Sequence, residues 1–245
     1  MCGVFGWLGD PGEWRHAHRL MVELAVAHEV RGIDAAGYAV LTSRGELLWR
    51  RQPGPARHLF CGDDFAALYS RGVTMAIGHT RLATTGAPAV NGNNHPHRAG
   101  DWLLVTNGFI PAHEEKAKKL NLRLRFQCDS EILVQALHRY GEVDGPVVCL
   151  SLRGKQSVLV INARSRRMLA WTNGEMPLVA FRVDDIDGLW WASTEEIAQE
   201  ALATVGLAAR FAEARSGVVY RLDVTDGQVV IQTRRAQKIA RNRRP

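Results

Sequence analysis

Met1-Cys2-Gly3-Val4-Phe5-Gly6 opens the chain, and the position of Cys2 in this stretch decides how the rest is interpreted. A small residue at position 2 allows the initiator methionine to be removed, which leaves Cys2 with both a thiol and a free α-amine. An α-amine has an unperturbed pKa of about 7.7–8, so part of it is neutral near neutral pH. It can therefore accept the thiol proton, which is the N-terminal form of an activated nucleophile.

The apolar stretch from Cys2 to Leu8 predicts a strand that enters the core. Further short strands are predicted at 38–41, 47–50, 73–77, 102–106, 157–161, 168–172, 178–182, 189–192, 218–222 and 228–232. Helices are predicted at 14–30, at 129–140, and from the capping-box sequence Ser193-Thr194-Glu195-Glu196 through Leu202. Many strands, with helices grouped before and after them, predict an α+β fold of two stacked sheets with helices outside.

Length and composition narrow the class of protein. The 245 residues, 46% of them hydrophobic, allow one large domain with a sizeable core. No run of about 18 apolar residues occurs, so no membrane-spanning helix is expected. Charged residues stand where a signal peptide would be apolar. The four cysteines lie far apart, which indicates reduced thiols. We therefore expect a cytoplasmic protein.

The positive charge of the chain is concentrated at its C-terminal end. Residues 234–245 hold six basic side chains and no acidic one, which equals the whole net charge of +6. We therefore expect one domain over residues 1–230, followed by a basic C-terminal tail over residues 231–245. Such a tail can contact nucleic acid or an acidic partner surface, and it can equally be a solvated chain end.

Three polar clusters mark the expected site: 78–86, 107–108 and 128–131. The first two follow predicted strands and the third begins a predicted helix, where a scaffold fixes side chains within reach of solvent. In them, Arg81 offers a planar fork to a carboxylate and Asp129 can accept from an ammonium group. Together these two would complement a free amino acid.

Asn107 and the amide of Gly108 could stabilise the oxyanion that forms when a thiolate attacks an amide. Each feature also has a simpler interpretation. Arg81 alone fits a surface or structural ion pair, Asn107-Gly108 fits a hairpin turn, and Asp129 fits a helix cap. With Cys2, however, the set describes an enzyme that attacks an amide on an amino acid.

The same clusters belong to an ordered set of segments that resembles the class II glutamine amidotransferases. The glutaminase domain of that family belongs to the N-terminal-nucleophile (Ntn) hydrolases. The order of the segments is the family's order, and the likeness covers roughly residues 2–225. The matching segments are Cys2-Gly3-Val4-Phe5-Gly6, Arg31-Gly32-Ile33-Asp34-Ala35-Ala36-Gly37, Gly78-His79-Thr80-Arg81-Leu82-Ala83-Thr84, Asn94-His95-Pro96-His97, Asn107-Gly108 and Asp129-Ser130-Glu131.

The resemblance implies a four-layer αββα sandwich of two stacked, mainly antiparallel sheets. It implies that Cys2 is the nucleophile of a glutaminase and that its own amine is the base. Arg81 would hold the α-carboxylate of glutamine and Asp129 its α-ammonium. Asn107 and Gly108 would form the oxyanion pair.

Four further positions match residues that shape the family's pocket. Arg31 and Gly32 correspond to residues close to the nucleophile, and Thr84 and Thr85 correspond to residues that line the pocket. The chain also departs from the family: Leu82 replaces an aromatic residue, and Thr85 replaces a histidine, of the aminosugar-synthesising members. This mixture assigns the chain to neither the aminosugar nor the purine subfamily.

We therefore expect a glutaminase subunit that converts L-glutamine to glutamate and ammonia through a γ-glutamyl thioester on Cys2. The ammonia would pass to a separate partner synthase. One alternative is a catalytically silent protein of the same fold whose basic tail engages nucleic acid or an assembly. Another is hydrolysis of a different small amide, because Leu82 and Thr85 alter the pocket walls.

Three histidines raise the possibility of a metal site. His79, His95 and His97 lie close in sequence, but no carboxylate or cysteine completes a metal-ligand spacing with them. The resemblance gives this region a metal-free role. We therefore expect neither a metal nor another cofactor.

Overall fold

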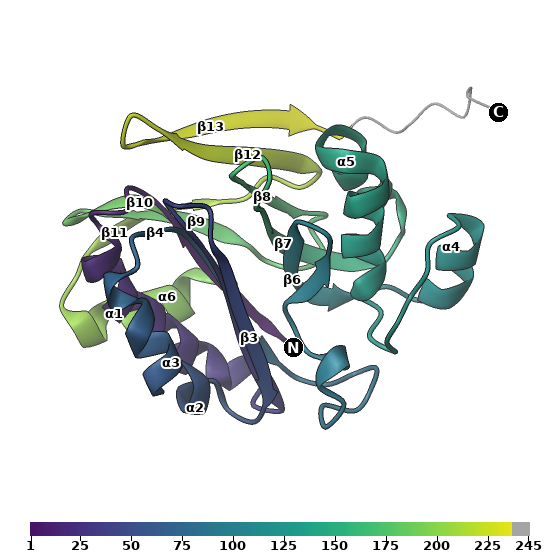
Figure 1. Ribbon diagram of the computed structural model, residues 1–245, viewed down its shortest axis with the longest axis horizontal. Helices are drawn as coiled ribbons and strands as arrows, with labels where there is room; N and C mark the ends of the chain where they lie inside the picture. The colour runs from purple at the N-terminus through teal and green to yellow at the C-terminus, as the bar shows by residue number, and fades with distance from the viewer. Residues whose placement is uncertain (237–245) are drawn as a thin grey trace.

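The computed structural model describes residues 1–236, and residues 237–245 lie outside the described part. Two sheets face each other in Figure 1, and every strand pairs with its neighbours in antiparallel fashion. The first sheet has the order β11-β9-β10-β1-β4-β2-β3 and the second has the order β13-β12-β8-β7-β6-β5.

The strands of the first sheet are β1 (Gly3–Leu8), β2 (Ala35–Thr42), β3 (Leu47–Pro53), β4 (Val73–Arg81), β9 (Val179–Val183), β10 (Ile186–Ala192) and β11 (Ala209–Glu213). The strands of the second sheet are β5 (His97–Ala99), β6 (Trp102–Phe109), β7 (Lys155–Asn162), β8 (Arg167–Thr172), β12 (Val218–Thr225) and β13 (Gln228–Arg235). The helices are α1 (Trp14–Ala27), α2 (Ala56–Phe60), α3 (Asp63–Ala66), α4 (His113–Lys119), α5 (Glu131–Ser151) and α6 (Glu195–Val205), with 3₁₀ turns η1 (His28–Arg31), η2 (Ala67–Ser70) and η3 (Asn91–Asn93).

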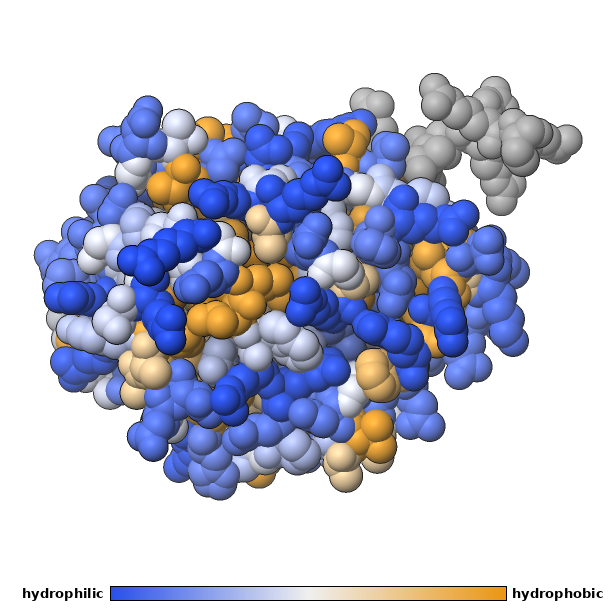
Figure 2. Space-filling model, in the orientation of Figure 1, coloured by the Kyte–Doolittle hydropathy of each residue, from blue (hydrophilic) through white to orange (hydrophobic). Residues whose placement is uncertain are grey.

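Three hydrophobic cores separate the layers. One joins α1 and α6 to the outer face of the first sheet, a second joins α5 to the outer face of the second sheet, and a third fills the space between the sheets. In Figure 2, hydrophobic residues gather near the centre of the face, where the two sheets meet in the same view, and hydrophilic residues surround them. The expected four-layer αββα sandwich is confirmed.

The strand β1 shows why this N-terminal sequence belongs in the centre of the fold. Its side chains alternate between two apolar layers, since successive residues of a strand point to opposite faces. Phe5 and Trp7 join the core under α1, whereas Val4 and Leu8 join the core between the sheets. Both faces of β1 are therefore covered, and all six of its residues are buried.

The helices differ in detail from the sequence predictions. The helix predicted over 14–30 ends at Ala27 and continues as a 3₁₀ turn. The helix predicted over 129–140 extends to Ser151, across a kink where Gly141 adopts a φ of 74°. The N-cap of α6 is Thr194, which accepts from the backbone N–H of Ile197, and Ser193 is instead hydrogen-bonded to the backbone of Val4.

The C-terminal boundary of the expected domain differs from the observed end of the second sheet. The strand β13 pairs with β12 as far as Arg235, so the first residues of the expected tail belong to the second sheet. The remainder of that tail, residues 237–245, lies outside the described part.

Among residues 1–236, none of the helices combines the length and the apolar character that crossing a membrane requires.

Candidate active site

Cys2 lies at the end of the first sheet because β1 is paired on both sides. In the register with β4, Gly3 is opposite Thr80, so Cys2 reaches the point where β4 ends at Arg81. The thiol of Cys2 donates to the backbone carbonyl of Leu82, with Sγ 3.4 Å from the oxygen. The side chain is partly exposed, so the sulfur is held in place but remains accessible.

Two residues of the turn between α1 and β2 fix the backbone around the thiol. The Nε of the buried Arg31 donates to the carbonyl of Cys2 at 2.7 Å. Gly32 packs directly against the end of β4, and a Cβ at this position would lie 2.5 Å from the carbonyl oxygen of Arg81. Arg31 therefore anchors Cys2, and only a glycine at position 32 allows the turn to approach β4 this closely.

Arg81 is a buried cation that contacts only neutral groups. Its guanidinium donates to Oδ1 of Asn94 at 2.7 Å and to the backbone carbonyls of Thr85 and Gly86 at 2.6 and 2.7 Å. The side chain is 2% exposed, and no carboxylate within residues 1–236 forms an ion pair with it. These contacts use three of the five N–H groups of an arginine, which leaves two that can bind an anion.

Asp129 is the opposite case, a buried carboxyl group without a cation. Its Oδ2 accepts from the backbone N–H of Ile110 at 2.6 Å, and the residue is 3% exposed. Burial raises the pKa of this carboxyl group, although the hydrogen bond from Ile110 acts in the opposite direction. In the part of the chain that the structure describes, no lysine, arginine or histidine forms an ion pair with it.

Asn107 and Gly108 lie at the end of β6 in the second sheet. Asn107 is 1% exposed, and its Nδ2 points to Sδ of Met176 at 3.3 Å. A thioether is a weak acceptor, so a developing oxyanion could replace it. Gly108 lies against the backbone of Lys155, which a Cβ would overlap. The Nδ2 of Asn107 therefore has only a weak acceptor among the described residues, and Gly108 lies close to the backbone of β7.

One hydrogen bond joins the two sheets beside the site. Nε2 of His79, on β4, lies 3.1 Å from the carbonyl oxygen of Thr106, on β6. Burial lowers the pKa of His79 to about 3, so its ring is neutral and this nitrogen can donate. Because His79 is close to Arg81 and Thr106 adjoins Asn107, the ends of both strands lie on the same side of the sandwich.

The electrostatics of the site keep the thiol of Cys2 protonated. Burial raises the pKa of the thiol, and the negative charge of Asp129 acts in the same direction. The positive charges of the Met1 ammonium and of Arg81 lower it, as does the backbone of Leu82, but together they do not outweigh burial. A base that removes the thiol proton is therefore required before the sulfur can attack a substrate.

The two threonines expected to line the pocket lie in the loop that follows β4. Thr85 is half-buried and gives its carbonyl to Arg81, whereas Thr84 is exposed. Leu82, which follows Arg81 directly, is 44% exposed. The loop therefore contributes to the site mainly through its backbone.

The structure adds three site residues to those that the sequence predicted. Asn94 fixes Arg81, Oδ2 of Asp34 accepts from the backbone N–H of Ala83 at 2.7 Å, and Met176 contacts Asn107. Asn94 and Asp34 belong to segments that carried the family resemblance, so those segments were a signal for them. Met176 carried no such signal.

The fold also brings three possible metal ligands together behind Asp129. His95, His97 and Cys128 each offer one donor atom, and these atoms all lie within 4.8 Å of one another. Cys128 thus supplies the cysteine that is missing from the spacing of the histidines in the sequence.

Comparison with known proteins gives one family. A family model described as a glutamine amidotransferase domain matches residues 57–212. The glutamine–fructose-6-phosphate aminotransferase of Pseudomonas syringae pv. tomato is 35% identical over 191 residues, which cover 73% of this chain and 30% of that protein. The enzyme of the same name from Geobacillus kaustophilus is 27% identical over 253 aligned positions, which cover 98% of this chain and 38% of that protein.

Solved structures agree on the fold. The glutamine phosphoribosylpyrophosphate amidotransferase of B. subtilis superimposes with a TM-score of 0.70 at 21% identity, over 96% of this chain and 49% of that one. A glutamine aminotransferase class-II domain protein of Silicibacter pomeroyi gives a TM-score of 0.56 at 13% identity, over 94% of this chain and 98% of that one. The chain therefore spans between 30% and 38% of the length of the two curated relatives.

Proposed function

The chain belongs to the class II glutamine amidotransferase family, and on this premise we propose that it hydrolyses the side-chain amide of L-glutamine to glutamate and ammonia. The observation that carries the proposal is the pair of buried, oppositely charged side chains Arg81 and Asp129, each of which contacts only neutral groups. Both charges act on the thiol of Cys2. A zwitterionic amino acid would neutralise both and present its side chain to the sulfur.

Removal of Met1 precedes the reaction and frees the α-amine of Cys2. The amine takes the thiol proton, and the thiolate attacks the amide carbon of glutamine. The oxyanion that forms is stabilised by Nδ2 of Asn107, which leaves Met176, and by the backbone N–H of Gly108. As the C–N bond breaks, the protonated amine returns its proton to the departing ammonia.

A γ-glutamyl thioester on Cys2 remains after ammonia has left. The α-amine then takes a proton from water, whose oxygen attacks the thioester carbon. The C–S bond breaks, glutamate is released, and the sulfur regains a proton. Arg31 holds the carbonyl of Cys2 during both steps, and Gly32 keeps the end of β4 close to it.

The α-carboxylate of glutamine binds to the two N–H groups of Arg81 that the protein leaves free. The α-ammonium binds to Asp129, whose Oδ1 is not used by the bond to Ile110 and is contacted by the thiol of Cys128, with Sγ at 4.0 Å. The loop with Thr84 and Thr85 lies next to Arg81, and the backbone carbonyl of Thr85 fixes the guanidinium. This division of the substrate between two charged ends leaves its amide at the sulfur of Cys2.

We propose further that the ammonia serves an amination on a separate partner protein. The names of the curated relatives describe transfer from glutamine to fructose 6-phosphate, so the ammonia released in those proteins serves an amination. Co-purification followed by mass spectrometry tests this step. A synthase that co-purifies and raises the glutaminase rate is expected. Full, unregulated turnover without any stable partner would contradict it.

Intact-mass measurement with an electrophilic glutamine analogue tests the proposed nucleophile. The purified protein is expected to lack Met1 and to gain one covalent adduct, which peptide mapping places on Cys2. The Cys2→Ala variant is expected to gain none, and Cys61→Ser, which changes an exposed thiol elsewhere, is expected to react like the wild type. An adduct on another residue would overturn the assignment.

A further inference from the structure

A buried cluster of two histidines and a cysteine lies beside the candidate active site. His95 is 3% exposed, His97 is 1% exposed and Cys128 is 3% exposed. Their possible ligand atoms lie within 4.8 Å of one another, although Cys128 comes from a distant part of the sequence. The proposed glutaminase mechanism uses none of these three side chains.

The histidines of this cluster lack partners for their ring nitrogens. Among the described residues, no group forms a hydrogen bond with either ring nitrogen of His95 or with Nε2 of His97. A buried polar atom without a partner costs free energy, so such atoms are rare in folded proteins. The rings are positioned by packing instead, with 3.9 Å between the ring centres of His79 and His95 and 4.4 Å between those of His95 and His97.

The chemistry of these donors suits a metal ion. Each ring has at least one nitrogen that has no hydrogen-bond partner among the described residues and can therefore bind an ion. Neutral imidazole and thiolate are the ligands that zinc prefers. A tetrahedral zinc ion would hold such atoms about 3.3–3.6 Å apart, so side chains that now lie within 4.8 Å of one another would move closer together when the ion binds.

We propose that His95, His97 and Cys128 form a binding site for a thiophilic divalent metal ion, for which Zn²⁺ is the best fit. Water can complete the four ligands. Cys128 binds as the thiolate, so one proton passes to solvent when the ion enters. The negative charge of the thiolate also offsets part of the ion's charge near Arg51, Arg81 and Arg125, whose charges act on His97.

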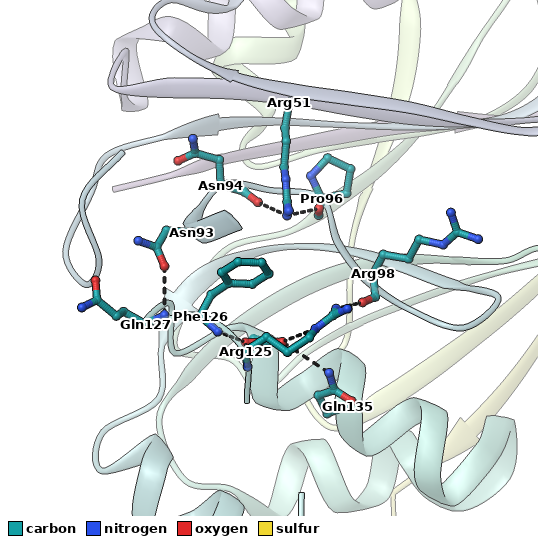
Figure 3. Close-up of polar contacts among 10 residues, drawn as sticks. Arg51, Asn93, Asn94, Pro96, Arg98, Arg125, Phe126, Gln127 and Gln135 are labelled. Atoms are coloured by element: carbon teal, nitrogen blue, oxygen red, sulfur yellow. Dashed lines mark hydrogen bonds and ion pairs between the residues drawn. The ribbon is translucent and has the colours of Figure 1, made fainter. Parts of the chain in front are cut away.

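The backbone around these donors is already fixed, as Figure 3 shows. An Nη1 of Arg51 donates to the carbonyls of Asn94 and Pro96 at 2.7 and 3.0 Å, on both sides of His95. The backbone N–H of Gln127 donates to Oδ1 of Asn93 at 2.9 Å, which joins the loop before the histidines to the loop before Cys128. The ion would therefore enter a site whose two halves are held together without it.

The location suggests what the ion does. Asn94 holds Arg81, and Asp129 follows Cys128 in the chain, so the ion would connect the two segments that carry the proposed glutamine contacts. This positioning role depends on the proposed function. Binding of the ion does not depend on the proposed function, so it is measured in a variant without glutaminase activity.

The test measures metal binding in a protein that has no nucleophile. In the Cys2→Ala/Cys61→Ser variant, the two accessible thiols are gone and glutaminase activity is absent by design. The metal-free protein is titrated with Co²⁺ as a spectroscopic probe, and Zn²⁺ is then added. We expect one equivalent of Co²⁺ with a thiolate-to-cobalt charge-transfer band, which Zn²⁺ displaces.

Variants of the ligands decide the assignment. Adding Cys128→Ser is expected to abolish the band, and adding His97→Gln is expected to weaken binding at least about tenfold. Adding Cys149→Ser, which changes a buried cysteine outside the cluster, is expected to leave the band unchanged. Absence of the band in the parent variant, or its persistence in a folded Cys128→Ser variant, would overturn the proposal.

Thermal unfolding supplies a second readout that a folding defect cannot imitate. Each variant is first melted with a chelator present, which shows whether it is folded without metal. Zn²⁺ is then expected to raise the Tm of the parent variant and of Cys149→Ser, because an ion that binds only the folded state stabilises it. Equal shifts in the variants with and without Cys128 would contradict the proposed site.

Discussion

Arg81 and Asp129 carry opposite charges, yet neither is neutralised by a partner within residues 1–236. Burying an unpaired charge is costly, so a residue that served stability alone would be expected to have an ionic partner. Here Arg81 is held by carbonyl oxygens and an amide, and Asp129 by a backbone N–H. The arrangement suits a site that is completed by a charged ligand.

Replacing Arg81 by lysine tests the proposed carboxylate contact. Lysine keeps the charge but loses the planar fork, so glutamine should bind more weakly while the chemical step is less affected. Loss of a charge-assisted hydrogen bond costs about 1.5–3 kcal/mol, which corresponds to an increase in KM of about 10- to 150-fold. Steady-state kinetics with glutamine measure this change. A Lys variant with unchanged KM would exclude Arg81 from substrate binding.

Replacing Asp129 by asparagine tests whether its charge serves the substrate or the fold. Burial raises the pKa of this carboxyl group, so near neutral pH its ionised form is less stable in the folded protein than in the unfolded chain. Asparagine can still accept from the N–H of Ile110 and carries no charge. We expect Asp129→Asn to raise the Tm near neutral pH and also to raise KM. A lower Tm together with normal KM would indicate a structural role instead.

At the scale of elements, the 3₁₀ turn after α1 connects the parts that surround Cys2. Within it, the buried His28 bonds through Nδ1 to the carbonyl of Leu24 at 2.7 Å and accepts at Nε2 from the backbone N–H of Ser193 at 3.2 Å. Ser193 is in turn bonded to Val4 on β1. Helix α1, strand β1 and the start of α6 are therefore joined through one neutral imidazole.

This junction predicts a loss of stability in mild acid. Burial lowers the pKa of His28 to about 3, whereas an unfolded histidine titrates at about 6.5. Between these values the unfolded chain binds the extra proton, so stability falls as the pH falls through 6.5. The slope from this one group reaches about 1.4 kcal/mol per pH unit.

Chemical denaturation at a series of pH values measures this slope. The variant His28→Gln is expected to be less stable near neutral pH and to lose this part of the pH dependence. The variant His16→Gln, which changes an exposed histidine on the preceding helix α1, is expected to keep the wild-type slope. Equal slopes in wild type and His28→Gln would show that another group controls the acid transition.

At the scale of the whole molecule, the sequence was sufficient to predict the layers because every central strand is marked by its own apolar residues. The predicted strands coincide with observed ones, except that Cys2 and Leu178 each lie one residue before the strand that begins at Gly3 or Val179, and the αββα sandwich is confirmed. The short strands β5 and β11 were not predicted, because they lie at the edges of their sheets and carry little apolar pattern. The helices α2, α3 and α4 were also missed, because they are short and carry little apolar pattern.

The sequence predicted only part of the candidate site, because some of its contacts form between loops that are distant in the chain. Cys2, Arg81, Asn107 and Asp129 stand in segments whose order resembled a family, so they could be named from the sequence. The approach of Cys128 to His95 and His97 depends on how two loops meet, and no local pattern encodes that contact. The neutral surroundings of Arg81 likewise became visible only in three dimensions.

The most direct test of the central assignment is ammonia release from L-glutamine by the wild type and by Cys2→Ala, compared across pH. We expect the wild-type rate to rise as the pH increases through about 7.7–8, where an α-amine loses its proton, and Cys2→Ala to release no ammonia above the blank. Release by Cys2→Ala at the wild-type rate would contradict the account, because the sulfur would then have no part in the chemistry.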